Sequence, residues 1–199
     1  LSDLKPALVI VEQGSENPVR QAAQGLGIPV VEAKVEAGMA AGAFSLFDKT
    51  AEISPADAEA EALVLHTSGT TSRPKVVPLL QKNILASARN IAASLELTDA
   101  DHCLNIMPLF HIHGLIAVLI SSLGKGASVC CSPGFNALKF MELATAEAIS
   151  WYSGVPTMHQ AILLRAKRNP EQAKALHLRF IRSSSASLPP AVFEELVKV

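Results

Sequence analysis

The sequence has 199 residues, a hydrophobic fraction of 49%, a charged fraction of 18% and a formal net charge of -1. This length is enough for one or two domains with a buried core, and the hydrophobicity excludes an intrinsically disordered chain. The near-neutral charge and an aromatic fraction of 5% exclude a surface built for dense phosphate contact or base stacking, so nucleic acid is not an expected partner.

The cysteines and the apolar stretches limit the class of protein further. Cys103, Cys130 and Cys131 form neither a disulfide framework nor a C-x-x-C zinc pair, which is typical of a reducing, intracellular compartment. The most apolar stretch, residues 115–120, is far shorter than the ~20 residues of a membrane span, and no signal peptide is visible. We therefore expect neither a membrane span nor a metal site.

Both ends of the sequence predict a piece of a longer chain. The first residue is Leu1 rather than methionine. Phe193, Leu196 and Val197 recur at helical spacing without a capping signal, so the sequence stops inside a predicted helix. A natural terminal helix is the alternative interpretation.

The first sixty residues predict one supersecondary unit. Residues 7–11 and 28–31 are short apolar runs typical of buried strands, and residues 19–26 between them suit a helix. Strand, helix and strand over this length predict a βαβ unit with parallel strands. Residues 36–60 are rich in Ala, Gly, Asp and Pro and predict a surface connector.

Strands and helices continue to alternate after residue 60, which predicts an α/β fold of layered αβα sheets flanked by helices. The predicted strands are residues 62–66, which we expect to be buried, 103–107, 127–131, 149–153 and 180–183. The predicted helices are residues 81–97, 114–123, 139–148 and 157–167, with a last helix starting near residue 189.

A polar loop, HTSGTTSRPK at residues 66–75, follows the first of these strands. Glycine permits a positive φ, consecutive backbone N–H groups in such a turn can surround an anion, and Lys75 adds a full positive charge. The loop therefore predicts a site for the terminal phosphates of a nucleotide. It lacks the G-K-[ST] of a Walker A loop and the chain has no G-x-G-x-x-G, which disfavours a P-loop phosphotransferase or a dinucleotide site. A polar surface turn is the alternative.

The S-G-T-T-x-x-P-K pattern of this loop resembles the phosphate-binding signature of the adenylate-forming enzymes: acyl-CoA synthetases, 4-coumarate–CoA ligases, luciferases and peptide-synthetase adenylation domains. Residues 108–114 (PLFHIHG) resemble that family's P-x-F-H-x-x-G motif, and residues 155–157 (VPT) and 182–188 (RSSSASL) resemble its V-P-T segment and S-G-G-A-P-L turn, all in family order. Family glycines and a proline are replaced here by Ser72, Val76, Ser184, Ser185 and Ser187.

The resemblance implies that this sequence is part of the large N-terminal domain of such an enzyme. Residues 1–60 would form its βαβ segment and connector, residues 61–199 its nucleotide- and acyl-binding part, and the C-terminal domain would lie outside this sequence. The resemblance assigns the ATP phosphates to Thr67, Ser68, Gly69, Thr70, Thr71, Ser72 and Lys75, the adenine to Ser185, Ala186 and Ser187, and the acid to His111, His113 and Ser183. Lys75 and His111 are the predicted catalytic residues, and His66, His102, His159 and His177 are expected to be structural or on the surface.

The motifs look most like the oxalate–CoA ligase and peroxisomal CoA-synthetase branch, which implies a cytoplasmic or peroxisomal ligase. Such an enzyme uses ATP, Mg²⁺ and coenzyme A, forms an acyl-AMP from a carboxylic acid, and transfers the acyl group to the thiol. Serines in place of glycines add donors beside His113, which suits a small polar acid such as oxalate. We expect this chain alone to be inactive, because the family's later motifs do not occur in it. A non-catalytic α/β scaffold or interaction domain is the alternative that the replaced glycines favour.

Overall fold

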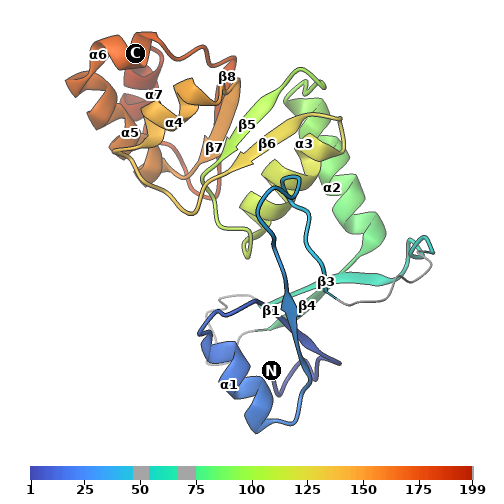
Figure 1. The fold of residues 1–199 in the computed structure, drawn as a ribbon. Helices are drawn as coiled ribbons and strands as arrows, with labels where there is room; N and C mark the ends of the chain where they lie inside the picture. Colours follow the sequence, from blue (N-terminus) through green and yellow to red (C-terminus); the bar gives the residue numbers. More distant parts are fainter. Residues whose placement is uncertain (47–53, 67–74, 199) are drawn as a thin grey trace. The chain divides into compact units, whose positions relative to one another are not determined.

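Figure 1 shows the computed structural model of the chain, which describes residues 1–46, 54–66 and 75–198. The chain divides into two compact units, Leu1–Pro55 and Ala56–Val199. No helix in the described ranges is long and apolar enough to cross a membrane.

The first unit is a βαβ motif. Strand β1 (Val9–Glu12) pairs in parallel with β2 (Val30–Ala33), and helix α1 (Pro18–Gly25) connects them. Asn17 caps this helix by accepting the Val19 N–H at 2.9 Å, and Pro18 occupies its first turn. The predicted parallel βαβ unit is confirmed, around a small core of Val9, Val11 and Ala23.

The second unit begins with a two-stranded antiparallel ribbon of β3 (Glu61–His66) and β4 (Val76–Leu80). The strand predicted at residues 62–66 is present, but the prediction that it is buried is wrong: its residues are half-buried or exposed. It pairs with β4 alone among the described strands and does not join the parallel sheet. Helix α2 (Gln81–Ser94) follows β4 directly.

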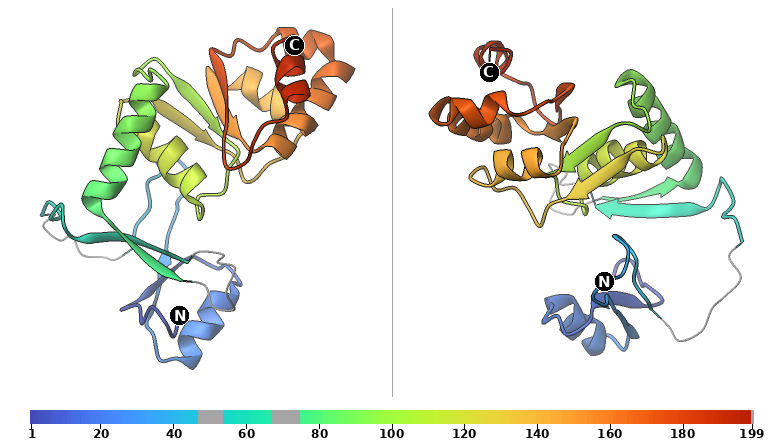
Figure 2. Two further views of the ribbon diagram at one scale, coloured as in Figure 1. Left: turned by 180° about the vertical axis from the view of Figure 1, so that it is seen from behind. Right: turned by 45° about the horizontal axis from the view of Figure 1, so that its top comes forward.

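A four-stranded parallel sheet forms the centre of this unit, in the order β6-β5-β7-β8. Figures 1 and 2 show its strands side by side, β5 (His102–Asn105), β6 (Ser128–Cys131), β7 (Trp151–Gly154) and β8 (Phe180–Ser183). Each strand overlaps a predicted strand, and a polar, Gly or Pro residue follows each predicted strand.

Helices cover both faces of the sheet, which confirms the layered αβα architecture. On one face, Cys103 and Trp151 pack with Val118 of the π-helix η1 (His113–Ile120), which continues into α3 (Ser121–Leu123), and with α2. The alternate residues Leu104 and Tyr152 face the opposite layer. That layer contains α4 (Phe140–Ala146), α5 (Pro156–Arg168) and the short α6 (Pro170–Lys174), and α7 (Pro190–Leu196) packs on α5.

The connections give this sheet a switch point between β5 and β7. The chain leaves β5 through η1 on one face to reach β6, and then passes through α4 on the other face to reach β7 on the opposite side of β5. The two loops after β5 and β7 therefore separate, and ligands of open α/β sheets bind in the crevice that this leaves at the carboxyl ends of the strands.

Candidate functional site

The loop after β5 brings His113 to this switch point. Asn105, the last residue of β5, donates through Nδ2 to the Gly114 carbonyl at 3.3 Å and so fixes the start of η1. A Cβ at Gly114 would lie 2.5 Å from the Pro108 carbonyl oxygen, so the chain can turn this tightly only with glycine at that position. π-Helical turns are rare and occur often at functional sites.

Three polar side chains meet around the His113 imidazole. Its Nε2 lies 2.7 Å from Ser153 Oγ of β7, and its Nδ1 lies 3.0 Å from Ser185 Oγ in the turn after β8. Arg182 Nη1 lies 3.2 Å from the same Nε2 and 3.0 Å from Ser153 Oγ, and Nη2 donates to Ser184 Oγ at 3.3 Å. We call His113, Ser153, Arg182 and Ser185 the switch-point cluster.

The hydrogen bonds of the cluster determine which nitrogen of His113 carries the proton. A guanidinium only donates, so the contact with Arg182 requires a bare Nε2, which then also accepts the Ser153 hydroxyl proton at 2.7 Å. In this tautomer Nδ1 carries the proton and donates to Ser185. The Ser185 hydroxyl therefore accepts from His113, and its own proton is left for a ligand.

Burial and a neighbouring cation keep this imidazole neutral. Burial, followed by the positive charge of Arg182 and the nearby His111 and His159, lowers the pKa of His113 from 6.5 to about 4. Burial also lowers the pKa of Arg182, although a guanidinium stays charged in proteins. The switch-point cluster thus holds one fixed positive charge on Arg182 and a neutral ring on His113.

Ser185 occupies an unusual backbone conformation. Its φ is +70°, in the left-handed region that favours glycine, and the family pattern that this turn resembles has glycine there. The side chain gains the bond to His113 in return. Ser185, Ala186 and Ser187 are exposed at the end of the sheet, where a ligand can reach them.

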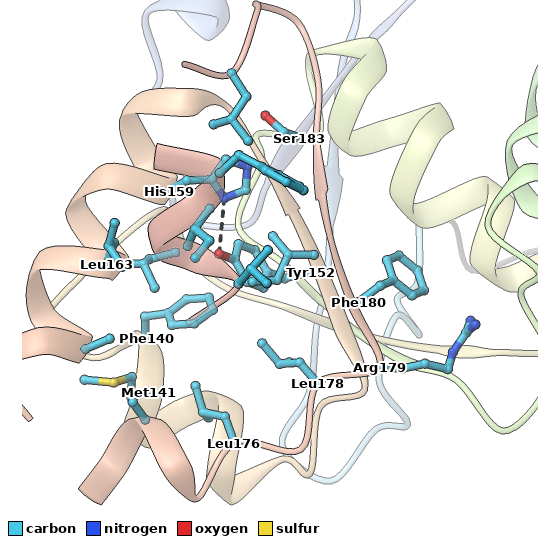
Figure 3. A pocket seen from close by; sticks show the side chains of 18 residues that line it. Phe140, Met141, Tyr152, His159, Leu163, Leu176, Leu178, Arg179, Phe180 and Ser183 are labelled. Atoms are coloured by element: carbon cyan, nitrogen blue, oxygen red, sulfur yellow. Dashed lines mark hydrogen bonds between the residues drawn. The ribbon is translucent and has the colours of Figure 1, made fainter. Parts of the chain in front are cut away.

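The structure places the predicted site residues in different regions. The predicted phosphate loop, Thr67 to Ser72, lies outside the described residues. Lys75 is exposed at the start of β4, and His111 is exposed with Nδ1 accepting the His113 N–H at 3.1 Å. Ser183 faces the opposite layer, where it lines an apolar pocket (Figure 3), and its buried Oγ has no hydrogen-bond partner among the described residues.

The sequence motifs predicted no role for Arg182 or Ser153. Arg182 is half-buried, and within the described part of the chain no carboxylate lies within ion-pair distance of it. A partly desolvated cation without an anionic partner attracts anionic ligands. The signal in the sequence is that Arg182 directly precedes the serine-rich turn, on the same face of β8 as Phe180.

The described residues contain no group of three or more His, Cys, Asp or Glu that could hold a metal ion.

The comparison with protein families identifies the family of this chain. Residues 1–199 match the family described as AMP-binding enzyme. The chain belongs to the AMP-binding enzyme family. Its described architecture is that of the N-terminal domain of adenylate-forming CoA ligases, and the predicted membership is confirmed.

Relatives of this chain include two oxalate–CoA ligases. The chain is 42% identical to the one from Arabidopsis thaliana over 98% of its own length, and 47% identical to the one from Saccharomyces cerevisiae over 69%. A malonyl-CoA ligase structure with methylmalonyl-CoA and AMP bound superposes over the whole chain with a TM-score of 0.80 and 29% identity. The chain spans 39%, 24% and 40% of the length of these three proteins, in that order.

Proposed function

We propose that the full-length protein containing this chain is an AMP-forming acid–CoA ligase for a small acid with two anionic groups, such as oxalate. Membership of the AMP-binding enzyme family and the two oxalate–CoA ligase relatives support the reaction type. The observation that carries the substrate class is the half-buried Arg182 beside the neutral His113 and the Ser185 hydroxyl.

Each member of the switch-point cluster has a role in this proposal. Arg182 attracts one anionic group of the acid, since its guanidinium has five N–H donors and only part of them are used internally. Ser185 donates its free hydroxyl proton to the same acid. His113, held neutral, orients Ser185 and adds no second positive charge.

The reaction consists of two displacements. A carboxylate oxygen of the acid attacks the α-phosphorus of Mg–ATP, the bond to the bridging oxygen breaks, and pyrophosphate leaves. The thiol sulfur of coenzyme A then attacks the acyl carbon, its proton passes to solvent, and AMP leaves. The protein contributes by positioning two anions against each other and offsetting their charge.

The remaining assignments follow the sequence motifs. Thr67 to Ser72 and Lys75 hold the β- and γ-phosphates, and Ser185, Ala186 and Ser187 contact the adenine. His111 accepts the His113 N–H at Nδ1, which leaves its Nε2 to face the acid or the α-phosphate. Ser183 is retained as a predicted acid-binding residue, although it lines the pocket on the other face.

At the level of the whole protein, we propose that residues 1–60 and 61–199 belong to one N-terminal domain, that a C-terminal domain of the same chain completes the active site, and that the enzyme acts in the cytoplasm or the peroxisome. The 199-residue chain alone is then inactive or nearly so.

Acid-dependent exchange of labelled pyrophosphate into ATP tests this function in the full-length protein. We expect exchange with oxalate or malonate, weak exchange with acetate or octanoate, and none from the 199-residue chain alone. Exchange with octanoate but not with oxalate would contradict the substrate class, and exchange by the chain alone would contradict the need for a C-terminal domain.

A non-catalytic scaffold remains the second candidate, because serines replace family glycines at Ser184 and Ser185. ATP titration of the full-length protein separates the two candidates. The ligase requires ATP binding that Lys75→Ala weakens, whereas a scaffold binds no ATP in either form.

A further inference from the structure

His159 of α5 is buried on the face of the sheet opposite to the switch-point cluster. It lines an apolar pocket of about 490 Å³ together with Tyr152 and Ser183 (Figure 3). Both ring nitrogens are already bonded within the protein. Nδ1 lies 3.1 Å from Tyr152 Oη, the bond drawn in Figure 3, and Nε2 lies 3.2 Å from the Gly154 carbonyl oxygen. The imidazole therefore has no free nitrogen for a ligand in this pocket.

The direction of these bonds follows from their partners. A carbonyl oxygen only accepts, so Nε2 carries the proton and donates to Gly154. Nδ1 is then bare and accepts the Tyr152 hydroxyl proton. Burial lowers the pKa of His159, which agrees with a neutral ring carrying one proton.

The Gly154 carbonyl connects this ring to the other side of the site. The same oxygen accepts the Ser184 N–H at 3.2 Å, and Ser184 begins the turn that carries Ser185. The imidazole packs tightly over Gly154, because a Cβ there would lie 3.3 Å from His159 Cε1. Two donors, one from each side, therefore fix the orientation of this single carbonyl group.

We propose that His159 is a positioning residue for the acid and nucleotide site: it holds the Gly154 carbonyl from the far face of the sheet and thereby sets the Ser184–Ser185 turn against His113. Tyr152 keeps the imidazole in the required tautomer. The consequence for catalysis rests on the proposed function, whereas the hydrogen-bond chain from Tyr152 to Ser184 stands without it.

Kinetics of the full-length protein test the proposal through His159→Leu, which keeps the bulk of the side chain and removes both ring nitrogens. Loss of one hydrogen bond that positions the turn is expected to raise KM for ATP and for the acid about fivefold. His159→Gln restores an amide donor near the position of Nε2 and is expected to bring both KM values back most of the way. Tyr152→Phe is expected to give a smaller rise than His159→Leu.

Ile162→Ala is the matched control, because Ile162 is buried one turn further along α5 in the same core and makes no polar contact with the turn. It is expected to lower the melting temperature with unchanged KM values. Equal KM changes in Ile162→Ala and His159→Leu would mean that His159 only contributes stability, and unchanged KM values in His159→Leu would also overturn the proposal.

Nuclear magnetic resonance tests the same chain of bonds without activity. We expect imidazole nitrogen shifts that place the His159 proton on Nε2, and Ser184 amide exchange about fivefold faster in His159→Leu than in Ile162→Ala. A proton on Nδ1, or equal exchange in the two variants, would overturn the proposal. If the unsubstituted protein shows no pyrophosphate exchange while these signals are as expected, the proposed function fails and the positioning of the turn remains.

Discussion

In the proposed ligase, Arg182 is the residue expected to distinguish an acid with two anionic groups from one with a single carboxylate. Arg182→Gln keeps an amide near Ser153 and removes the charge. Because a hydrogen bond to a charged group is worth about 1.5–3 kcal/mol, KM for oxalate in the full-length protein is expected to rise roughly 10- to 100-fold. KM for acetate should change much less. Steady-state kinetics with both acids measure this, and Arg168→Gln on the exposed surface of α5 is the control. Parallel changes for the two acids would contradict the assignment.

The protonation of His113 makes the stability of the fold depend on pH. Its folded pKa is about 4, against 6.5 for the free side chain, so the unfolded chain binds a proton in this range before the folded chain does. The contribution of His113 to stability is complete above about pH 6.5 and is lost as pH falls towards 4, at up to about 1.4 kcal/mol per pH unit.

Proton resonance titration of the His113 ring measures this pKa directly. The signal is expected to stay at its neutral position down to about pH 5, and its absence from His113→Gln assigns it. A midpoint near 6.5 would contradict a neutral ring at the switch point.

At the scale of elements, η1 depends on the absence of a side chain at Gly114. Gly114→Ala places a Cβ 2.5 Å from the Pro108 carbonyl oxygen and 2.8 Å from that of Met107, so the loop or the helix has to move. We expect a loss of about 2 kcal/mol or more and a lower melting temperature. Gly25→Ala in α1, where a Cβ meets nothing within 4 Å, is expected to be neutral or slightly stabilising. Equal melting temperatures of the two variants would contradict the role of Gly114.

The opposite end of the sheet is held by Asp101, which precedes β5. It accepts bonds from Arg179 at 2.9 and 3.0 Å and from Ser150 at 2.9 Å, and so joins the starts of three strands. Burial acts to raise the pKa of Asp101, but hydrogen bonds from Thr98, Arg179 and Ser150 and the charge of Arg179 together lower it. Its contribution to stability is therefore present above the ordinary carboxyl pKa and is lost as pH falls below it.

Asp101→Asn removes the charged acceptor from this junction. The expected loss is about 2 kcal/mol, because bonds to a buried charge are replaced by weaker ones. Thermal unfolding at pH 7 measures it, with Asp99→Asn on the surface as the control. The difference between the two variants should shrink in acid, and a constant difference down to low pH would contradict the role of the carboxylate.

The strands of the central sheet were predictable because each is a short segment rich in apolar or aromatic residues that a polar, Gly or Pro residue follows. The burial of β3 was not, because a run such as ALVLH does not show whether it joins a sheet or a ribbon. The π-helical geometry of η1 could not be predicted either, because a segment that is apolar on all sides shows no hydrophobic periodicity from which the helix type could be inferred. Of the site, motifs gave His113 and the serine turn. The contacts of His113 with Ser153 and Ser185 join residues that are 40 and 72 positions apart in the sequence, and no local sequence pattern can reveal them.

At the scale of the whole molecule, the two compact units differ in how much core each has. Leu1–Pro55 has a core cluster of three buried residues, whereas Ala56–Val199 contains two larger clusters, one on each face of its sheet. A chain of this size with so small a core gains too little from burial to offset its conformational entropy.

Separate expression of the two units tests this difference. Residues 1–55 alone are expected to be unfolded, and residues 56–199 to keep a cooperative thermal transition by circular dichroism. A cooperative transition in the smaller piece would show that its core suffices, and loss of structure in the larger piece would show that it needs the first unit.

At Ser185, whose backbone is left-handed, a substitution by glycine is expected to raise the stability of the fold and to weaken ligand binding. Glycine there relieves a conformation that costs a non-glycine residue about 1–2 kcal/mol, but it removes the hydroxyl bonded to His113. A laboratory selection of the full-length protein for heat resistance alone is therefore expected to favour glycine at this position and, if the proposed function holds, to weaken binding of the acid. Selection for turnover of the acid should retain the strained serine.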